Sequence, residues 1–189
     1  MTSNTLFEAL NTVTHSRESR QFFANKLLNK KHLIPKTLDI LFQVDDVVSC
    51  RAAWVLEFMC REKPEALFPY LTDFTQNLNK IHLDAAVRPV AKICEYLAEA
   101  YYAKEYVLLK NKITPKHIEC IVEVCFDYLI NDEKIAPKAY AMNTLYLFGK
   151  DIDWIHPELK LLIERDYQMQ SSGFKARARQ ILKKIKAAK

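Results

Sequence analysis

The chain has 189 residues, enough for one domain with a sizeable core and too few for two large ones. Half of its residues are hydrophobic and 27% are charged, a balance typical of a folded protein. It contains only two glycines, where average usage of about 7% would give roughly thirteen. Phosphate-binding loops and dinucleotide fingerprints require several glycines close together, so the composition excludes nucleotide-loop enzymes of the common α/β kinds.

Helical rather than alternating periodicity of apolar residues runs through almost every segment. Thr114 and Pro115 predict an N-cap followed by proline in the first helical position, where its missing N–H costs nothing. Asp46, Asp84 and Asp132 precede apolar runs and are expected N-caps, as is Ser172. We therefore expect an all-α fold of about ten helices, over residues 4–13, 17–28, 36–44, 46–61, 65–78, 84–101, 115–130, 132–148, 157–169 and 172–185.

A repeat runs through most of the chain. Residues 51–56 align with residues 88–93 at a spacing of 37, and residues 138–142 align with residues 175–179 at the same spacing. The interval from 88 to 138 is longer by 13, which fits an insertion of a short helix and loop over residues 101–113. We predict one helical domain over residues 1–189: an N-terminal helical pair (1–30), about four repeats (36–187) and a basic C-terminal helix (175–189).

The motif within these units resembles HEAT and armadillo repeats. Asp46 precedes the run RAAWVL, and Asp84 precedes Val87, Arg88 and Ala91. The resemblance implies an α-α superhelix in which acidic and basic residues form a ladder between repeats. It assigns to this structural ladder Asp46, Arg51, Asp84, Arg88, Asp132 and Lys138. The other interpretation is a phosphate-binding stripe along the basic positions Arg51, Arg88, Lys138 and Lys175.

Residues 44–58 (VDDVVSCRAAWVLEF), 81–95 and 145–167 also look like a group of short bacterial HEAT-like proteins that have been labelled adenylosuccinate lyase. That label implies a mobile loop of the form SSxMPxKxNP. Residues 171–175 (SSGFK) are the segment most similar to this loop, but they lack its Met-Pro and Asn-Pro. A lyase therefore ranks third among the functions that we consider.

No residue pattern indicates a catalytic, metal or cofactor site. The five histidines are isolated along the chain, and no pair lies four residues apart. Cys120 and Cys125 are five residues apart, which on a helix separates their side chains by about 140°. The paired carboxylates Asp45 and Asp46 lie at a helix boundary, where acids cap N–H groups. We therefore predict that the chain is not an enzyme and binds no cofactor.

The cysteines and the N-terminus bear on location. Five cysteines, an odd number, lie in apolar stretches, as expected for reduced and buried thiols. The N-terminal segment has no apolar signal core, and no run reaches the roughly 18–20 apolar residues of a membrane span. We expect a cytoplasmic protein without a membrane span.

Charge is unevenly distributed. Residues 175–189 carry seven basic side chains and no acidic one, which leaves residues 1–174 with 21 basic and 23 acidic groups, a net charge of −2. Lys175, Arg177, Arg179, Lys183 and Lys184 are therefore the expected nucleic-acid contacts, if the protein binds nucleic acid. The same helix would otherwise cap the stack with a polar face.

Tyrosines on the second helices of the repeats suggest a different role. Tyr96, Tyr140 and Tyr146 lie where helical repeats commonly present a concave surface, and tyrosine is favoured at protein interfaces. Our leading prediction is a non-catalytic scaffold module that binds a protein partner through these tyrosines. Nucleic-acid binding through the basic C-terminal helix is the alternative.

Overall fold

The computed structural model describes residues 3–105 and 111–187, and this part of the chain folds into ten α-helices without strands. Short 3₁₀ segments connect several of them. In chain order the helices are α1 (Ser3–Asn11), α2 (Arg17–Asn29), α3 (Ile34–Leu41), α4 (Val47–Glu62), α5 (Leu71–Gln76), α6 (Asp84–Tyr102), α7 (Pro115–Ile130), α8 (Ile135–Phe148), α9 (Ile155–Asp166) and α10 (Ser172–Ala187). The predicted all-helical fold of about ten helices is confirmed for these residues.

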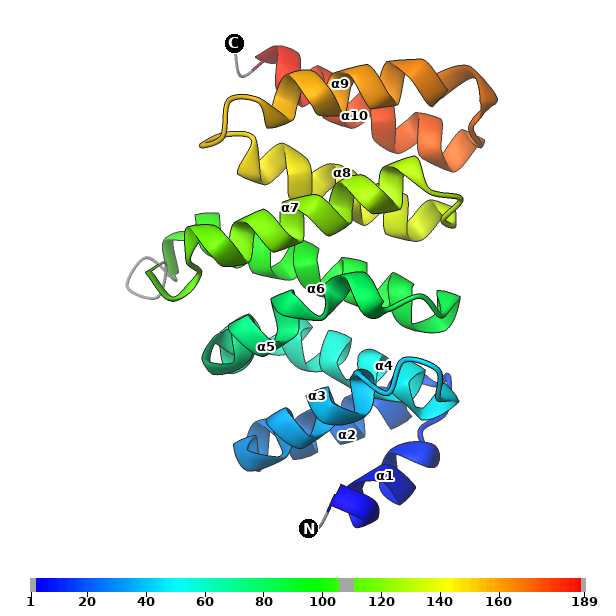
Figure 1. Cartoon of the computed structure of the whole chain (residues 1–189), viewed down its shortest axis with the longest axis vertical. Helices are drawn as coiled ribbons and strands as arrows, with labels where there is room; N and C mark the ends of the chain where they lie inside the picture. Colours follow the sequence, from blue (N-terminus) through cyan, green and yellow to red (C-terminus); the bar gives the residue numbers. More distant parts are fainter. Residues whose placement is uncertain (1–2, 106–110, 188–189) are drawn as a thin grey trace.

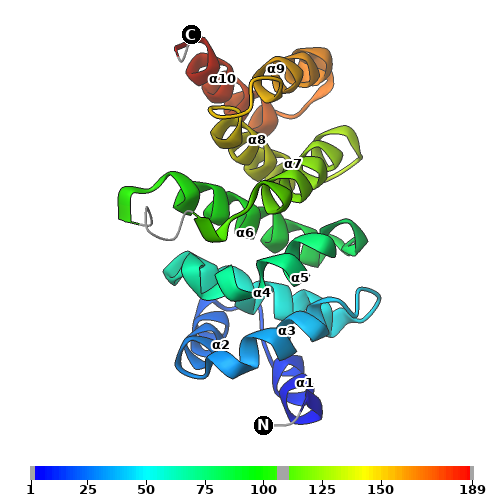
Figure 2. The same cartoon turned by 60° about the vertical axis from the view of Figure 1, so that its left-hand side comes forward.

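The helices lie in two layers that follow the chain from one end of the molecule to the other (Figure 1). Helices α2, α4, α6, α8 and α10 form one layer, in which each contacts the next. Helices α3, α5, α7 and α9 form the other layer, and α1 packs against α3 and α4. Figure 2 shows the even-numbered layer toward the left and the odd-numbered layer toward the right. One face of each layer is therefore left outside the interior.

Buried apolar side chains fill the space between the two layers as one continuous core from Leu6 to Ile185. Small residues let the central helices approach closely: Ala52 and Ala53 of α4 and Ala91 of α6 have no exposed surface. Full burial of a leucine-sized side chain contributes about 1.5–3 kcal/mol. The stack is thus held together mainly by apolar contacts between consecutive helices.

Two of the predicted N-caps are present. The Asp46 side chain accepts a hydrogen bond from the backbone N–H of Val48 at 2.7 Å. The Thr114 hydroxyl accepts from the N–H of His117 at 3.4 Å, and the His117 ring nitrogen accepts from the N–H of Thr114 at 3.2 Å. This reciprocal pair satisfies two donors that the first turn leaves free, and α7 begins at Pro115 as predicted.

The other three expected caps are wrong. Asp84 is the first residue of α6, and Leu83 occupies the N-cap position. Asp132 lies before α8, which begins only at Ile135. This later start places Pro137 in the first turn, where a missing N–H breaks no hydrogen bond. Ser171 rather than Ser172 caps α10, because the Ser171 hydroxyl accepts from the N–H of Phe174 at 3.3 Å.

The helix expected over residues 65–78 is also wrong. The chain there forms a 3₁₀ segment (Pro64–Tyr70), the short helix α5 and a further 3₁₀ turn (Leu78–Lys80). Pro69 lies inside the first segment, and proline both lacks an N–H and clashes with the preceding turn of an α-helix. The insertion predicted over residues 101–113 includes residues 106–110, which lie outside the described residues, as does Lys189.

Candidate functional site

Cations and aromatic rings alternate along the outer side of the even-numbered layer. Residues three or four apart share one side of a helix, so each helix contributes one stripe to this surface. Pairwise contacts link the stripes from α2 to α10. We call this surface the even-helix face; it is lined by Arg20, Phe58, Arg61, Arg88, Lys92, Tyr96, Glu99, Tyr140, Tyr146, Arg177 and Lys184.

Lys92 is the centre of the even-helix face. Its ammonium group lies 4.6 Å from the ring centroid of Tyr96 on α6 and 4.8 Å from that of Tyr140 on α8. It also pairs with Glu95, whose surface is only 2% exposed. Burial raises the pKa of Tyr96 to about 12, with a further contribution from the nearby charge of Glu57. Two of the predicted partner-binding tyrosines are therefore brought together by a lysine that the sequence analysis did not identify.

Tyr146 lies nearer the C-terminal end of the face. The imidazole of His156 stacks on its ring at 5.5 Å and 12°, and the His156 Nε2 atom is 2.9 Å from the Tyr146 carbonyl oxygen. Lys184 of α10 lies 5.2 Å from the ring centroid, and Lys150 lies 5.4 Å from it. A Cβ atom at Gly149 would be 2.2 Å from the His156 ring, so the stack depends on this glycine.

At the N-terminal end, the guanidinium of Arg20 lies 5.3 Å from the ring centroid of Trp54 and 5.4 Å from that of Phe58. Arg61 covers Phe58 at 4.2 Å. Cation–π pairs of this kind contribute about 0.5–1 kcal/mol at exposed sites. They hold long cationic side chains against the surface rather than free in solvent.

Glu57 lies beneath these cations with 7% of its surface exposed. It accepts a hydrogen bond from Arg88 at 2.9 Å. Burial raises the pKa of Glu57, and the charges of Arg88, Arg20 and Lys92 oppose this shift. Burial likewise raises the pKa of Glu99, and Glu95 adds to that shift. Cations outnumber carboxylates on the face; Glu57 and Glu95 are buried, whereas Glu99 is exposed.

The predicted nucleic-acid residues of α10 divide between two sides of that helix. Lys184 and Arg177 face the even-helix face, where Arg177 interacts with Glu99. Lys175 donates to the Gln168 carbonyl at 3.0 Å and Arg179 donates to the Tyr167 hydroxyl at 3.3 Å, both away from that face. Lys183 is exposed. Lys175, Arg179 and Lys183 follow one another at four-residue intervals and form a row on one side of α10, opposite Arg177 and Lys184.

The predicted ladder residues have partners other than one another. Arg51 donates to the Asn11 carbonyl and side-chain oxygens, and Lys138 donates to the Leu129 carbonyl at 3.2 Å. Asp84 pairs with Lys134 at 2.6 Å. Arg88 pairs with Glu57 of the preceding even-numbered helix, Asp46 caps its own helix, and Asp132 is exposed before α8.

The thiols lie inside the structure. Cys50, Cys60, Cys94 and Cys125 are buried and unbridged, and Cys120 is half-buried. Burial raises the pKa of Cys60 and of Cys125 well above the ordinary value, which disfavours the reactive thiolate. Among the described residues, no three histidine, cysteine, aspartate or glutamate side chains are placed to share a metal ion.

Only some of the contacts on the even-helix face could be predicted from the sequence. Lys92 and Tyr96 are four residues apart on one helix, so their proximity could have been inferred from helical spacing. Arg20 gives no such signal, because its aromatic partners Trp54 and Phe58 lie on a different helix.

Comparisons with protein-family models, with curated proteins and with solved structures each find no match. In residues 3–105 and 111–187, no helix has both the length and the apolar character needed to cross a membrane.

Proposed function

We propose that this chain is a non-catalytic binding module of the HEAT-like α-solenoid type, and that it binds a protein partner through the even-helix face. The two-layer stack supports the solenoid part, because each helix buries its apolar side on its neighbours and leaves an extended face free. The 37-residue spacing supports it too, since the aligned segments of α4 and α6 lie on adjacent helices of one layer.

One observation carries the proposal for the site: Lys92 is held between Tyr96 and Tyr140, which come from two different helices. Packed tyrosines and cations dominate the binding energy of many protein interfaces. Here the contacts also fix the side chains before a partner arrives, which reduces the entropy lost on binding.

The charges indicate what kind of partner would fit. Lys184 is exposed and the side chains of Arg61 and Lys92 are partly exposed, whereas Glu57 and Glu95 are buried. A protein segment that carries carboxylates would meet the cations first and would be steered toward them. We infer that the partner presents an acidic segment to this face.

Nucleic acid is the second candidate, supported by the exposed cations of α10. One feature of the face opposes it. The ring faces of Tyr96 and Tyr146 are already covered by lysine ammonium groups, so they are not open to stack on bases.

The test is affinity purification of the tagged chain from its native cell after nuclease treatment, followed by calorimetry with the recovered partner. We expect one stoichiometric protein that the Tyr140→Ala variant fails to retain. The matched control, Lys160→Ala, changes an exposed lysine on α9 in the other layer and should retain it. Circular dichroism checks that both variants fold. Retention by Tyr140→Ala, or loss of all bound material on nuclease treatment, would contradict the proposal.

A further inference from the structure

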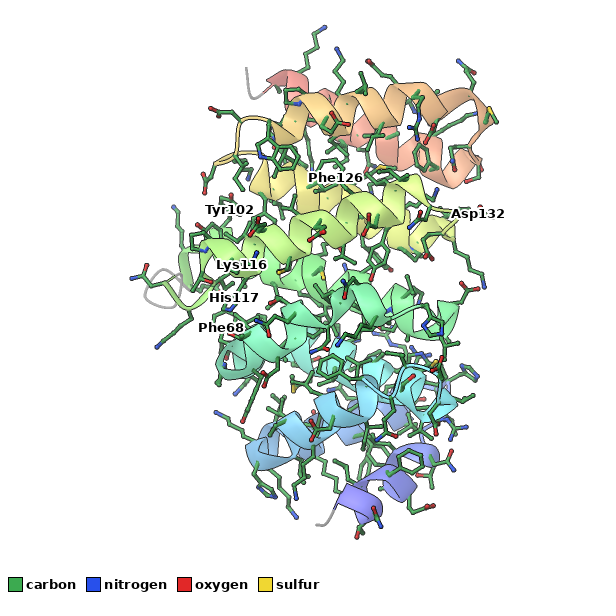
Figure 3. All side chains as sticks on the ribbon, viewed as in Figure 1. Phe68, Tyr102, Lys116, His117, Phe126 and Asp132 are labelled. Carbon is green, nitrogen blue, oxygen red and sulfur yellow. The ribbon has the colours of Figure 1, made fainter. Side chains whose placement is uncertain are left out.

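A second surface lies on the odd-numbered layer, away from the even-helix face. Trp154, in the connection between α8 and α9, is 56% exposed although it is one of the largest apolar side chains of the protein. Its indole stacks on the ring of Phe126 with 5.6 Å between centroids and 22° between planes. Figure 3 shows Phe126 on the side of α7 toward α9. One face of the indole is thus held by Phe126, while more than half of the surface of Trp154 remains exposed.

Trp154 and Phe126 form part of a groove of about 550 Å³. Val122, Ile152 and Pro115 supply further apolar lining. This volume lies within the range of about 300–1,000 Å³ that is usual for ligand-binding pockets. The groove is therefore large enough to receive a side chain together with part of its backbone.

The rim of this groove on α7 is acidic. Glu119, Glu123 and Asp127 line it and follow one another at four-residue intervals, so they form a row on one side of the helix. Lys116 pairs with Glu119 at 2.7 Å. Within the described parts of the chain, the carboxylates of Glu123 and Asp127 are in no ion pair, and both residues are exposed. Three carboxylates and one lysine thus leave the rim with a net negative charge beside the exposed Trp154.

We propose that this groove binds an arginine side chain of a partner protein, with an apolar neighbour of that arginine seated against Val122 and Ile152. A guanidinium group stacks on an aromatic face and pairs with carboxylates through a planar fork of donors. Trp154 supplies the aromatic face, and Glu123 and Asp127 supply the carboxylates. Charge complementarity selects a basic segment, which is the opposite of the acidic segment proposed for the even-helix face.

The test follows the indole N–H signals of the folded chain by nuclear magnetic resonance. The protein has two tryptophans, Trp54 and Trp154, and the Trp154→Phe variant assigns their signals. The probe is a short capped peptide of alternating arginine and leucine; the control peptide has glutamine in place of arginine. We expect the arginine peptide to shift the Trp154 signal in a saturable and salt-sensitive manner, with Trp54 unmoved, and the glutamine peptide to leave both signals in place.

Charge removal tests the rim. The Glu123→Gln/Asp127→Asn variant keeps the shape of the groove and should weaken binding of the arginine peptide at least tenfold. The matched control, Glu8→Gln/Asp39→Asn, removes two exposed carboxylates from α1 and α3 of the same side of the molecule and should bind as the native chain does. An unmoved Trp154 signal, an equal response to the glutamine peptide, or equal binding by the rim variant would overturn the proposal. Tyr140→Ala, which tests the even-helix face, should not alter the result.

Discussion

The ammonium group of Lys184, in the last helix, lies 5.2 Å from the ring centroid of Tyr146 on α8. The sequence suggested these two residues for different functions, lysine for nucleic acid and tyrosine for a protein partner. The structure places both on the even-helix face, so a single binding event can use both.

The pair Lys183 and Lys184 offers a matched test of this relationship. Lys184→Ala should weaken partner binding about two- to fivefold, because the cation–π contact that holds the Lys184 ammonium group in place against Tyr146 contributes about 0.5–1 kcal/mol. Lys183→Ala removes the same charge from the adjacent, exposed position and should change binding less than twofold. Calorimetry with the purified partner measures both, and equal effects of the two variants would mean that only the net charge of α10 matters.

Glu57 should give the protein an unusual pH dependence. Burial raises the pKa of Glu57 in the folded chain above the ordinary value of 4.5. The Glu57 carboxyl group therefore stays protonated to a higher pH in the folded state than in the unfolded state. Its contribution to stability is then fully present below about pH 4.5 and is lost as the pH rises through the folded pKa. Glu57→Gln cannot titrate. Urea unfolding should show the stability difference, native minus variant, growing as the pH falls from 7 toward 4.5. A difference that shrinks instead would mean that the Arg88 ion pair outweighs burial.

Gly149→Ala should destabilise the fold by about 1–3 kcal/mol, a cost typical of an overpacked site. The added Cβ would lie 2.2 Å from the His156 ring. Gly173→Ala is the control, since its Cβ would meet Ile135 at 3.3 Å and alanine favours the helix by up to about 1 kcal/mol. Thermal unfolding compares the two. Adding His156→Ala to Gly149→Ala should recover part of the lost stability, because it removes the ring that the added Cβ would contact. If the double variant instead loses the sum of the two single losses, the clash is not the cause.

Thiol chemistry should distinguish Cys120 from the other cysteines. It is half-buried, whereas Cys50, Cys60, Cys94 and Cys125 are buried. With a disulfide reagent at neutral pH, we expect one thiol to react quickly in the folded chain and all five in denaturant. Cys120→Ser should abolish the fast phase. Rapid reaction of a second thiol in the native protein would show that a buried helix opens readily.

The lyase resemblance predicts release of fumarate from adenylosuccinate, and we expect none from the purified chain. Ser171, in the segment that echoes the lyase loop, accepts a hydrogen bond from Phe174 and caps α10. Lys175 of the same segment donates to the Gln168 carbonyl. Both side chains serve local structure. Fumarate formation that scales with protein and is lost in Lys175→Ala would contradict this expectation.

Much of the helical architecture could be predicted because its causes are local. Apolar spacing and capping identified α7 from Pro115 to Ile130 and placed Asp46 at the start of α4. Errors arose where a nearby proline changed the position or the type of the helix that the local pattern predicted. Asp132 resembles a cap, but α8 begins later, with Pro137 in its first turn, and Pro69 turns an expected helix into 3₁₀ segments.

The candidate sites depended on tertiary structure. Lys92 and Tyr140 are 48 residues apart, and Trp154 and Phe126 are 28 apart, so no helical spacing relates them. Their contacts depend on the angle and register at which consecutive helices pack, which many side chains of the shared core decide together. The sequence by itself determined most of the helical segments and which of their sides are apolar. Only the packed stack decided which cations meet which rings, because those contacts join helices that local physics leaves independent.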